Sequence, residues 1–250
     1  MKKIGIIRPC KIGDIIISLP IGKYYFDKGY DVYWPIMSKY YQMFNEVAGH
    51  YIKFIPTTNS DFFALNAAKG ELVDRKILNT LNLSFNNIGS FDDLNSIGYA
   101  DSKLTFDQYI YLLAEVPFHY KWNLEIKRNL IEEERVFKQF VENEKYSACH
   151  FEVNYNRYGW QKGEQTRNGY FNLCKNKIKN KTIEISEDKK VKSVFYWIKV
   201  LENSDQLFLV DSSFMNLVEA LQIKNEKYLL IKAFDHPKGT PVTKSNWIFI

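Results

Sequence analysis

Asp14 is the residue in the first part of the chain whose type and position best suit chemistry. An apolar strand is expected at 3–8, then a tight turn, Lys11-Ile-Gly-Asp14, and then an apolar helix at 15–28. In open α/β sheets ligands bind at the carboxyl ends of the strands, where this turn places its carboxylate. There Asp14 can serve as a general base that takes a proton from a hydroxyl group. The alternative is that Asp14 only caps the helix, because aspartate is a favoured N-cap residue.

A second segment of this kind begins at Asp211, between an expected strand at 206–210 and an expected helix at 214–221. The free backbone N–H groups and the positive dipole end of a helix N-terminus suit a diphosphate. The hydroxyl groups of Ser212 and Ser213 add hydrogen-bonding capacity. The alternative is a helix that Asp211 or Ser212 merely caps.

The stretch 153–182 holds seven basic side chains against one acidic one, with aromatic residues between them. This composition suits phosphate groups, and the alternative is a solvated basic face. Arg157 is favoured for such a contact because a guanidinium binds phosphate with two parallel hydrogen bonds. The basic residues are Arg157, Lys162, Arg167, Lys175, Lys177, Lys179 and Lys181; the aromatic ones are Tyr155, Tyr158, Trp160, Tyr170 and Phe171.

Two motifs carry a resemblance to a known family. The turn Lys11-Ile-Gly-Asp14, the apolar run to Pro20 and the strand Gly29-Tyr-Asp-Val-Tyr-Trp34 look like the opening of the heptosyltransferase-like glycosyltransferases, family 9, which have the GT-B fold. The segment Asp211-Ser-Ser-Phe-Met-Asn-Leu-Val-Glu-Ala220 resembles that family's D-(S/T)-G-x-M-H-x-x-A-A motif. This chain departs from the motif at Ser213, where Gly is usual, and at Asn216, where His is usual.

The resemblance implies roles for these residues. Asp14 would be the base, with Lys11 and Gly13 beside it at the acceptor. Arg157 and Lys162 would hold the donor phosphates, together with Asp211, Ser212, Ser213 and Asn216. Glu184 or Glu187 would hold the donor ribose, and we assign Glu187. The donor would be a UDP- or ADP-linked sugar, and no metal is expected to be required, because no D-x-D follows a strand.

Composition excludes several other classes. Three cysteines and four histidines stand without metal-type spacing, so a zinc site is not expected. The chain has no P-loop, no G-x-S-x-G elbow and no G-x-G-x-x-G fingerprint. Its apolar runs are shorter than a membrane span. Arg8 and Lys11 interrupt what would be a secretory signal, so a cytoplasmic protein is expected, in the host cytoplasm if a phage encodes it.

Strands alternate with helices along the chain, which indicates parallel sheets. We predict an α/β protein of two Rossmann-like halves with a central cleft, as in GT-B: an acceptor domain at 1–120 and a nucleotide-sugar domain at 129–250. Helices are expected near 60–82 and at 105–116, and the segment 117–127 should connect the halves. The net charge of +5 lies wholly in the second half, since residues 126–250 carry 21 basic and 16 acidic side chains.

The predicted function is transfer of a sugar, with inversion, from a nucleotide sugar to an acceptor hydroxyl. Two acceptors stay open. One is a saccharide of the lipopolysaccharide-core type, and the other is a hydroxymethylated DNA base, since the basic aromatic stretch suits DNA phosphates and an extruded base. The alternative function is a nucleotide- or nucleic-acid-binding protein without catalysis. The sequence predicts no oligomeric state.

Overall fold

The computed structural model describes residues 2–9, 11–60, 63–84, 98–99, 101–142, 144–152, 164–186, 191–230 and 241–250. The chain divides into two compact units, residues 1–127 and 128–250, called unit 1 and unit 2 below. Each unit has its own parallel sheet, so the predicted α/β class with two parallel-sheet halves is confirmed.

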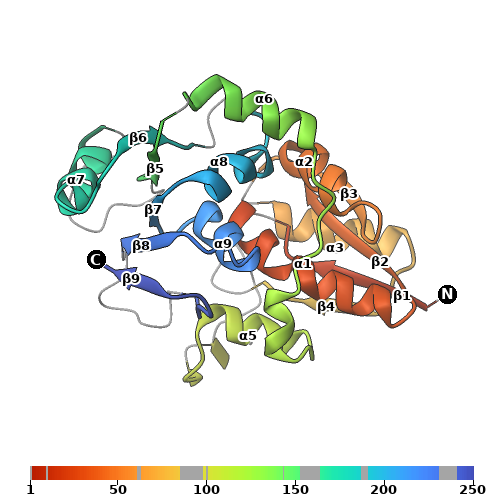
Figure 1. Ribbon diagram of the computed structural model, residues 1–250. Helices are drawn as coiled ribbons and strands as arrows, with labels where there is room; N and C mark the ends of the chain where they lie inside the picture. The colour runs from red at the N-terminus through yellow and green to blue at the C-terminus, as the bar shows by residue number, and fades with distance from the viewer. Residues whose placement is uncertain are drawn as a thin grey trace. The chain divides into compact units, whose positions relative to one another are not determined.

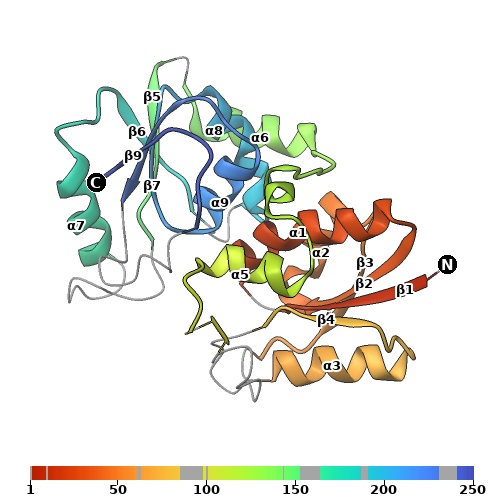
Figure 2. The same ribbon diagram turned by 90° about the horizontal axis from the view of Figure 1, so that it is seen from below.

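Unit 1 contains a four-stranded parallel sheet with the strand order β3-β2-β1-β4. Helices α1 and α2 lie on one face of this sheet and α3 lies on the other (Figures 1 and 2). Its elements are β1 (Lys2–Ile7), α1 (Ile12–Asp27), β2 (Tyr30–Met37), α2 (Ser38–Ala48), β3 (Lys53–Thr57), α3 (Ala64–Asp74), β4 (Thr80–Asn82), α5 (Phe106–Leu113) and the 3-10 helix η1 (Phe118–Trp122).

Unit 2 contains a five-stranded sheet in the order β6-β5-β7-β8-β9, with every neighbouring pair parallel. Helix α7 covers one face, and α8 and α9 lie on the other (Figure 2). Its elements are α6 (Leu130–Phe140), β5 (Tyr146–His150), α7 (Glu164–Cys174), β6 (Lys181–Glu184), η2 (Val194–Trp197), α8 (Ile198–Asn203), β7 (Gln206–Val210), α9 (Ser213–Ala220), β8 (Glu226–Leu230) and β9 (Trp247–Phe249).

The central strands form the cores because parallel strands with helices on both faces are buried on both sides. All five residues of β5 and all five of β7 are buried. Helix α1 is apolar around most of its circumference, and Ile15, Ile16 and Leu19 are fully buried in it. This burial fixes the turn that carries Asp14 against the sheet.

Several elements differ from the sequence-based expectation. The helix expected near 60–82 covers only α3, and the chain returns to the sheet as the short strand β4. Part of the basic stretch forms α7, for which no helix was expected. The last residues form a strand, β9, that pairs with β8. In the part of the chain that the structure describes, no helix is both long and apolar enough to span a membrane.

Candidate functional site

In each sheet the strand order reverses at one place, called the topological switch point. In unit 1, β2 and β3 are added on one side of β1 and β4 on the other; in unit 2, β6 lies on one side of β5 and β7 on the other. Ligands of open α/β sheets bind outside the carboxyl ends of the strands at such switch points. Asp14 follows β1, and Asp211 follows β7, so the two predicted segments lie at the switch points of their own units.

Asp14 lies within the first turn of α1 and not in a loop before it. The helix begins at Ile12, three residues earlier than expected, and its N-cap position is Lys11, which has a positive φ of 67°. No side chain caps this terminus by a hydrogen bond, so the alternative that Asp14 only caps the helix is wrong. Lys11 is exposed and Gly13 is half-buried beside it; their role at the acceptor stays a prediction.

Arg8 is the partner of Asp14, and the sequence analysis assigned Arg8 no role in the site. Its Nη2 lies 3.1 Å from Asp14 Oδ2, and its Nη1 donates to the Leu83 carbonyl at 2.6 Å. The Arg8 residue is 6% exposed, whereas the Asp14 side chain is 26% exposed. The ion pair therefore holds a carboxylate that solvent still reaches, at the carboxyl edge of β1.

In unit 2 the N-terminus of α9 presents side chains that other described residues do not satisfy. Ser212 is the N-cap residue, yet its side chain makes no capping hydrogen bond. The Ser212 Oγ and the Asn216 Oδ1 are both buried and have no described hydrogen-bond partner. Buried polar atoms are nearly always paired, so a site with two such atoms is a candidate ligand site. Asp211 is half-buried and Ser213 is buried in the same turn.

Helix α9 is held in place by its neighbours on the sheet. The His150 ring, at the end of β5, packs on the Phe214 ring with centroids 4.7 Å apart, and His150 Nδ1 lies 2.9 Å from the Ile185 carbonyl. The Glu219 carboxylate accepts hydrogen bonds from the Ser245 N–H and the Trp247 indole N–H. The helix N-terminus is thus fixed at the switch point.

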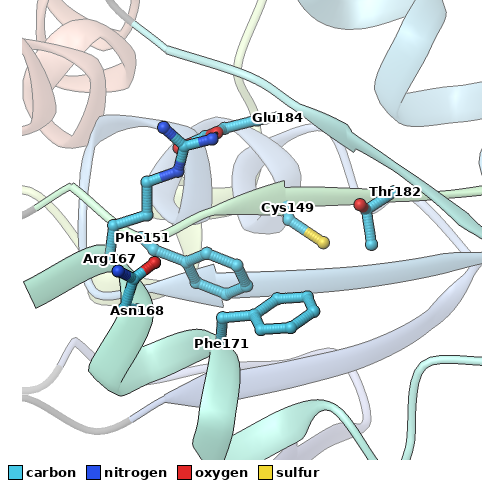
Figure 3. Close-up of a pocket in the computed structure, with 7 residues that line it drawn as sticks. All are labelled: Cys149, Phe151, Arg167, Asn168, Phe171, Thr182 and Glu184. Atoms are coloured by element: carbon cyan, nitrogen blue, oxygen red, sulfur yellow. The ribbon is translucent and has the colours of Figure 1, made fainter. Parts of the chain in front are cut away.

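A cavity of about 260 Å³ opens beside this edge, between α7 and the strands β5 and β6 (Figure 3). Phe151 and Phe171 present their rings to it, with centroids 6.4 Å apart. The mouth carries the Arg167–Glu184 ion pair. Burial raises the pKa of the Glu184 carboxyl above its ordinary value, and the Arg167 charge opposes that shift. The cavity is lined by Cys149, Phe151, Arg167, Asn168, Phe171, Thr182 and Glu184.

Three predicted donor-binding residues, Arg157, Lys162 and Glu187, lie outside the described residues. Among those described, no group of three or more histidine, cysteine or acidic side chains is arranged to hold a metal ion.

The described part of the basic stretch carries less free charge than its composition suggests. Arg167 pairs with Glu184, Lys179 with Glu226 and Lys181 with Glu142. Its described aromatic residues are Tyr170, which is buried in the core, and Phe171, which lines the cavity.

Solved structures of glycosyltransferases have this fold. A family 9 glycosyltransferase from Veillonella parvula aligns with 99% of this chain and 87% of its own at a TM-score of 0.62 and 11% identity. The E. coli ADP-heptose lipopolysaccharide heptosyltransferase II aligns with 99% of this chain and 90% of its own, at a TM-score of 0.57 and 10% identity. E. coli heptosyltransferase WaaC with ADP-2-deoxy-2-fluoro heptose aligns with 99% of this chain and 92% of its own, at a TM-score of 0.51 and 12% identity.

The resemblance found from two motifs is therefore confirmed at the level of the fold, over nearly the whole chain. No protein-family model matches the sequence, and no curated protein is similar to it in sequence.

Sequence reasoning missed Arg8 and the cavity for different reasons. Arg8 follows β1 directly, and its place at the carboxyl end of a strand was a usable signal. The cavity has no such signal, because Cys149 and Thr182 come from strands and Phe171 from a helix that was not expected.

Proposed function

We propose that this chain is an inverting glycosyltransferase that moves a sugar from a nucleotide-sugar donor to an acceptor hydroxyl. The observation that carries the proposal is the Asp14 carboxylate, solvent-accessible at the switch point of unit 1 and held by Arg8. The likeness to glycosyltransferases over 99% of the chain supports it. A cytoplasmic location stays a prediction from the sequence.

Unit 2 is proposed to bind the donor. The diphosphate would lie at the N-terminus of α9, where backbone N–H groups and the helix dipole favour anions. The Ser212 hydroxyl can donate to a phosphate oxygen, and the Asn216 amide can do so after it turns its NH₂ group toward the ligand. The predicted phosphate cations Arg157 and Lys162, and Glu187 at the ribose, belong to the same proposal.

The nucleoside of the donor is proposed to enter the cavity beside α7. Strand β5 contributes Cys149 to the cavity, and its neighbour β7 leads into α9. The proposal is therefore that one nucleoside diphosphate binds with its nucleoside in the cavity and its diphosphate at α9. The Phe151 and Phe171 rings offer apolar contact for a base, and Glu184 and Thr182 offer hydrogen bonds.

The proposed reaction is a single displacement. Asp14 takes the proton of the acceptor hydroxyl as its oxygen attacks the anomeric carbon from the side opposite the leaving group. A new glycosidic C–O bond forms, the C–O bond to the diphosphate breaks, and the configuration at the anomeric carbon inverts. The electron pair leaves with the nucleoside diphosphate, whose developing charge the N–H groups of α9 stabilise.

We propose a saccharide acceptor. Two of the similar structures are heptosyltransferases, one named for lipopolysaccharide. A DNA acceptor has less support, because three described cations of the basic stretch are already in ion pairs and Tyr170 is buried.

The test is release of nucleoside diphosphate from a panel of ADP- and UDP-sugars that includes ADP-heptose. The acceptors are a core oligosaccharide, plain DNA and DNA with 5-hydroxymethylcytosine. Release that depends on the oligosaccharide supports the proposal, and release only with hydroxymethylated DNA corrects the acceptor. Donor binding without release in any pairing overturns catalysis in favour of a binding protein.

A further inference from the structure

Arg8 joins three segments at the edge of the sheet in unit 1. It follows β1, donates to the Leu83 carbonyl just after β4, and pairs with Asp14 in the first turn of α1. Its own carbonyl accepts a hydrogen bond from the Trp34 indole N–H at 3.0 Å. Arg8 is 6% exposed and its Nη1 and Nη2 both have partners, so the guanidinium has little freedom to move.

The pair with Arg8 decides the direction of the Asp14 carboxylate. In a capping box, a Glu or Gln side chain in the third position of a helix turns back to accept from the N-cap N–H. In α1 no side chain caps the terminus, and Asp14 Oδ2 is directed at Arg8 instead. The other carboxylate oxygen, Oδ1, has no hydrogen bond to another described residue, so it is the atom left to receive a proton.

We infer that Arg8 is a positioning residue for the base: it holds Oδ2 so that Oδ1 is directed at the acceptor hydroxyl, without touching substrate itself. This inference rests on the proposed function. A reacting atom displaced by about 1 Å costs roughly 10²-fold in rate, so the orientation of Asp14 is worth that order of kcat.

The test compares Arg8→Gln and Arg8→Lys with the wild type in steady-state kinetics, with the donor that the panel identifies. Arg8→Gln should lower kcat about 10²-fold and leave KM for the donor within about twofold. Arg8→Lys keeps the charge but not the two-ended geometry, so its kcat should lie between those of Arg8→Gln and the wild type. Each kcat is calculated per folded molecule, so partial unfolding of a variant would not by itself produce this order of kcat values.

A double variant shows whether Arg8 acts through Asp14. If it does, Arg8→Gln in an Asp14→Asn background should cause no further loss of kcat, because residues that act as a unit are not additive. The matched control is Lys121→Met. It breaks the buried Lys121–Asp107 ion pair of the same unit, with Nζ and Oδ2 2.5 Å apart, and should lower the melting temperature with little change in kcat at a temperature where the variant is folded.

The outcomes separate this inference from the proposed function. A wild-type chain that is silent with every donor overturns the proposed function and the role of Arg8 with it. An active wild type with a full kcat in Arg8→Gln overturns the positioning role alone. Multiplicative losses in the double variant also overturn it, because Arg8 would then act independently of Asp14.

Discussion

Lys127 and Arg128 are neighbours in the chain, yet their hydrogen bonds belong to different units. The Lys127 N–H donates to the Val47 carbonyl at 2.8 Å, in α2 of unit 1. The Arg128 guanidinium binds Glu133 of α6 and Glu202 of α8 in unit 2, and these carboxylates raise its pKa above the ordinary value. The boundary between the units therefore falls at one peptide bond, with a firm anchor on each side of it.

Asp14→Asn should lower kcat by about 10²- to 10⁴-fold, because the amide cannot accept the acceptor proton as a carboxylate does. The dissociation constant of the donor should stay unchanged, because the proposed donor-binding residues lie in unit 2. Stopped assays of diphosphate release and calorimetric titration with the donor measure the two quantities.

The control for this variant is Asp27→Asn on the same helix. Asp27 is the last residue of α1, and its side chain is 52% exposed and paired with Lys23. Exposed ion pairs contribute roughly 0–1 kcal/mol, so this variant should retain wild-type kcat and stability. Equal activity of Asp14→Asn and Asp27→Asn would remove Asp14 from the chemistry.

Asn216→Ala should weaken donor binding without loss of stability. The Asn216 Oδ1 is buried without a described partner, so its removal relieves an unsatisfied group, and the free energy of unfolding should stay within about 1 kcal/mol of the wild type. The dissociation constant of ADP or UDP should rise about tenfold with one hydrogen bond lost. Chemical denaturation and calorimetric titration give the two values.

Asn225→Ala is the matched contrast in the same unit. The Asn225 amide donates to the Leu201 carbonyl at 2.9 Å and to the Ser204 hydroxyl at 3.1 Å. Its removal deletes both hydrogen bonds, although the Ser204 hydroxyl still donates to the Leu201 carbonyl. At about 0.5–1.5 kcal/mol for each bond, stability should fall by about 1–3 kcal/mol, with nucleotide binding unchanged. If the two asparagine variants lost stability equally, Asn216 would be an ordinary structural residue.

The Glu184 carboxyl should make stability depend on pH in a direction unusual for an acid. Burial raises the pKa of Glu184 in the folded state. Its contribution to the stability of the fold is therefore fully present below its pKa in the unfolded chain and is lost as pH rises through its pKa in the folded chain. Glu184→Gln should therefore gain stability relative to the wild type between acid and neutral pH. Thermal melts from pH 4 to 8 measure this difference.

Glu142→Gln should show the opposite sign. The hydrogen bond from Lys181 lowers the pKa of the exposed Glu142 carboxyl. Its contribution to the stability of the fold is therefore present above its pKa in the unfolded chain and is lost as pH falls through its pKa in the folded chain. A Glu184→Gln variant that followed the same trend as Glu142→Gln would contradict the burial of Glu184.

The thiols of unit 2 should resist modification by thiol reagents. Burial raises the pKa of Cys174 to about 11 and raises the pKa of Cys149 as well, and the thiolate is the reactive form. At pH 8 only about one Cys174 in a thousand is ionised. In a Cys10→Ser chain, neither thiol should react with a chromogenic disulfide reagent until denaturant is added. Rapid labelling of Cys149 would mean that the cavity is wider than the structure gives.

The alternation of strands and helices and the position of Asp14 after β1 were readable from the sequence, because buried parallel strands are continuous apolar runs and β1 and β7 each lead into a helix. The end of α3 was not readable. The chain turns there at Lys76, which has a positive φ of 57° that glycine usually supplies. Strand β4 has only three residues, and its pairing with β1 is a tertiary effect.

Within the candidate site, the positions of the residues after their strands were readable from the sequence, and their contacts were not. The sequence identified Asp14 and the turn at Ser212 from their positions after strands. The position of Arg8 directly after β1 was a usable signal for the site, but its contact with Asp14 depends on the path of α1 and was not predictable. The sequence also overstated the charge of 153–182, because the acids that pair with Lys179 and Lys181 lie far from them in the sequence.

The hydrogen bonds that the Glu219 carboxylate accepts from Ser245 and Trp247 connect the candidate site in unit 2 with a distant surface. They join α9 to β9, an edge strand of the sheet in unit 2, and to the residues just before that strand. An antibody, a fused tag or a proteolytic cut that separates β9 from the sheet would break these hydrogen bonds to Glu219. If α9 binds the donor as proposed, such an agent should weaken donor binding without occupying the donor site.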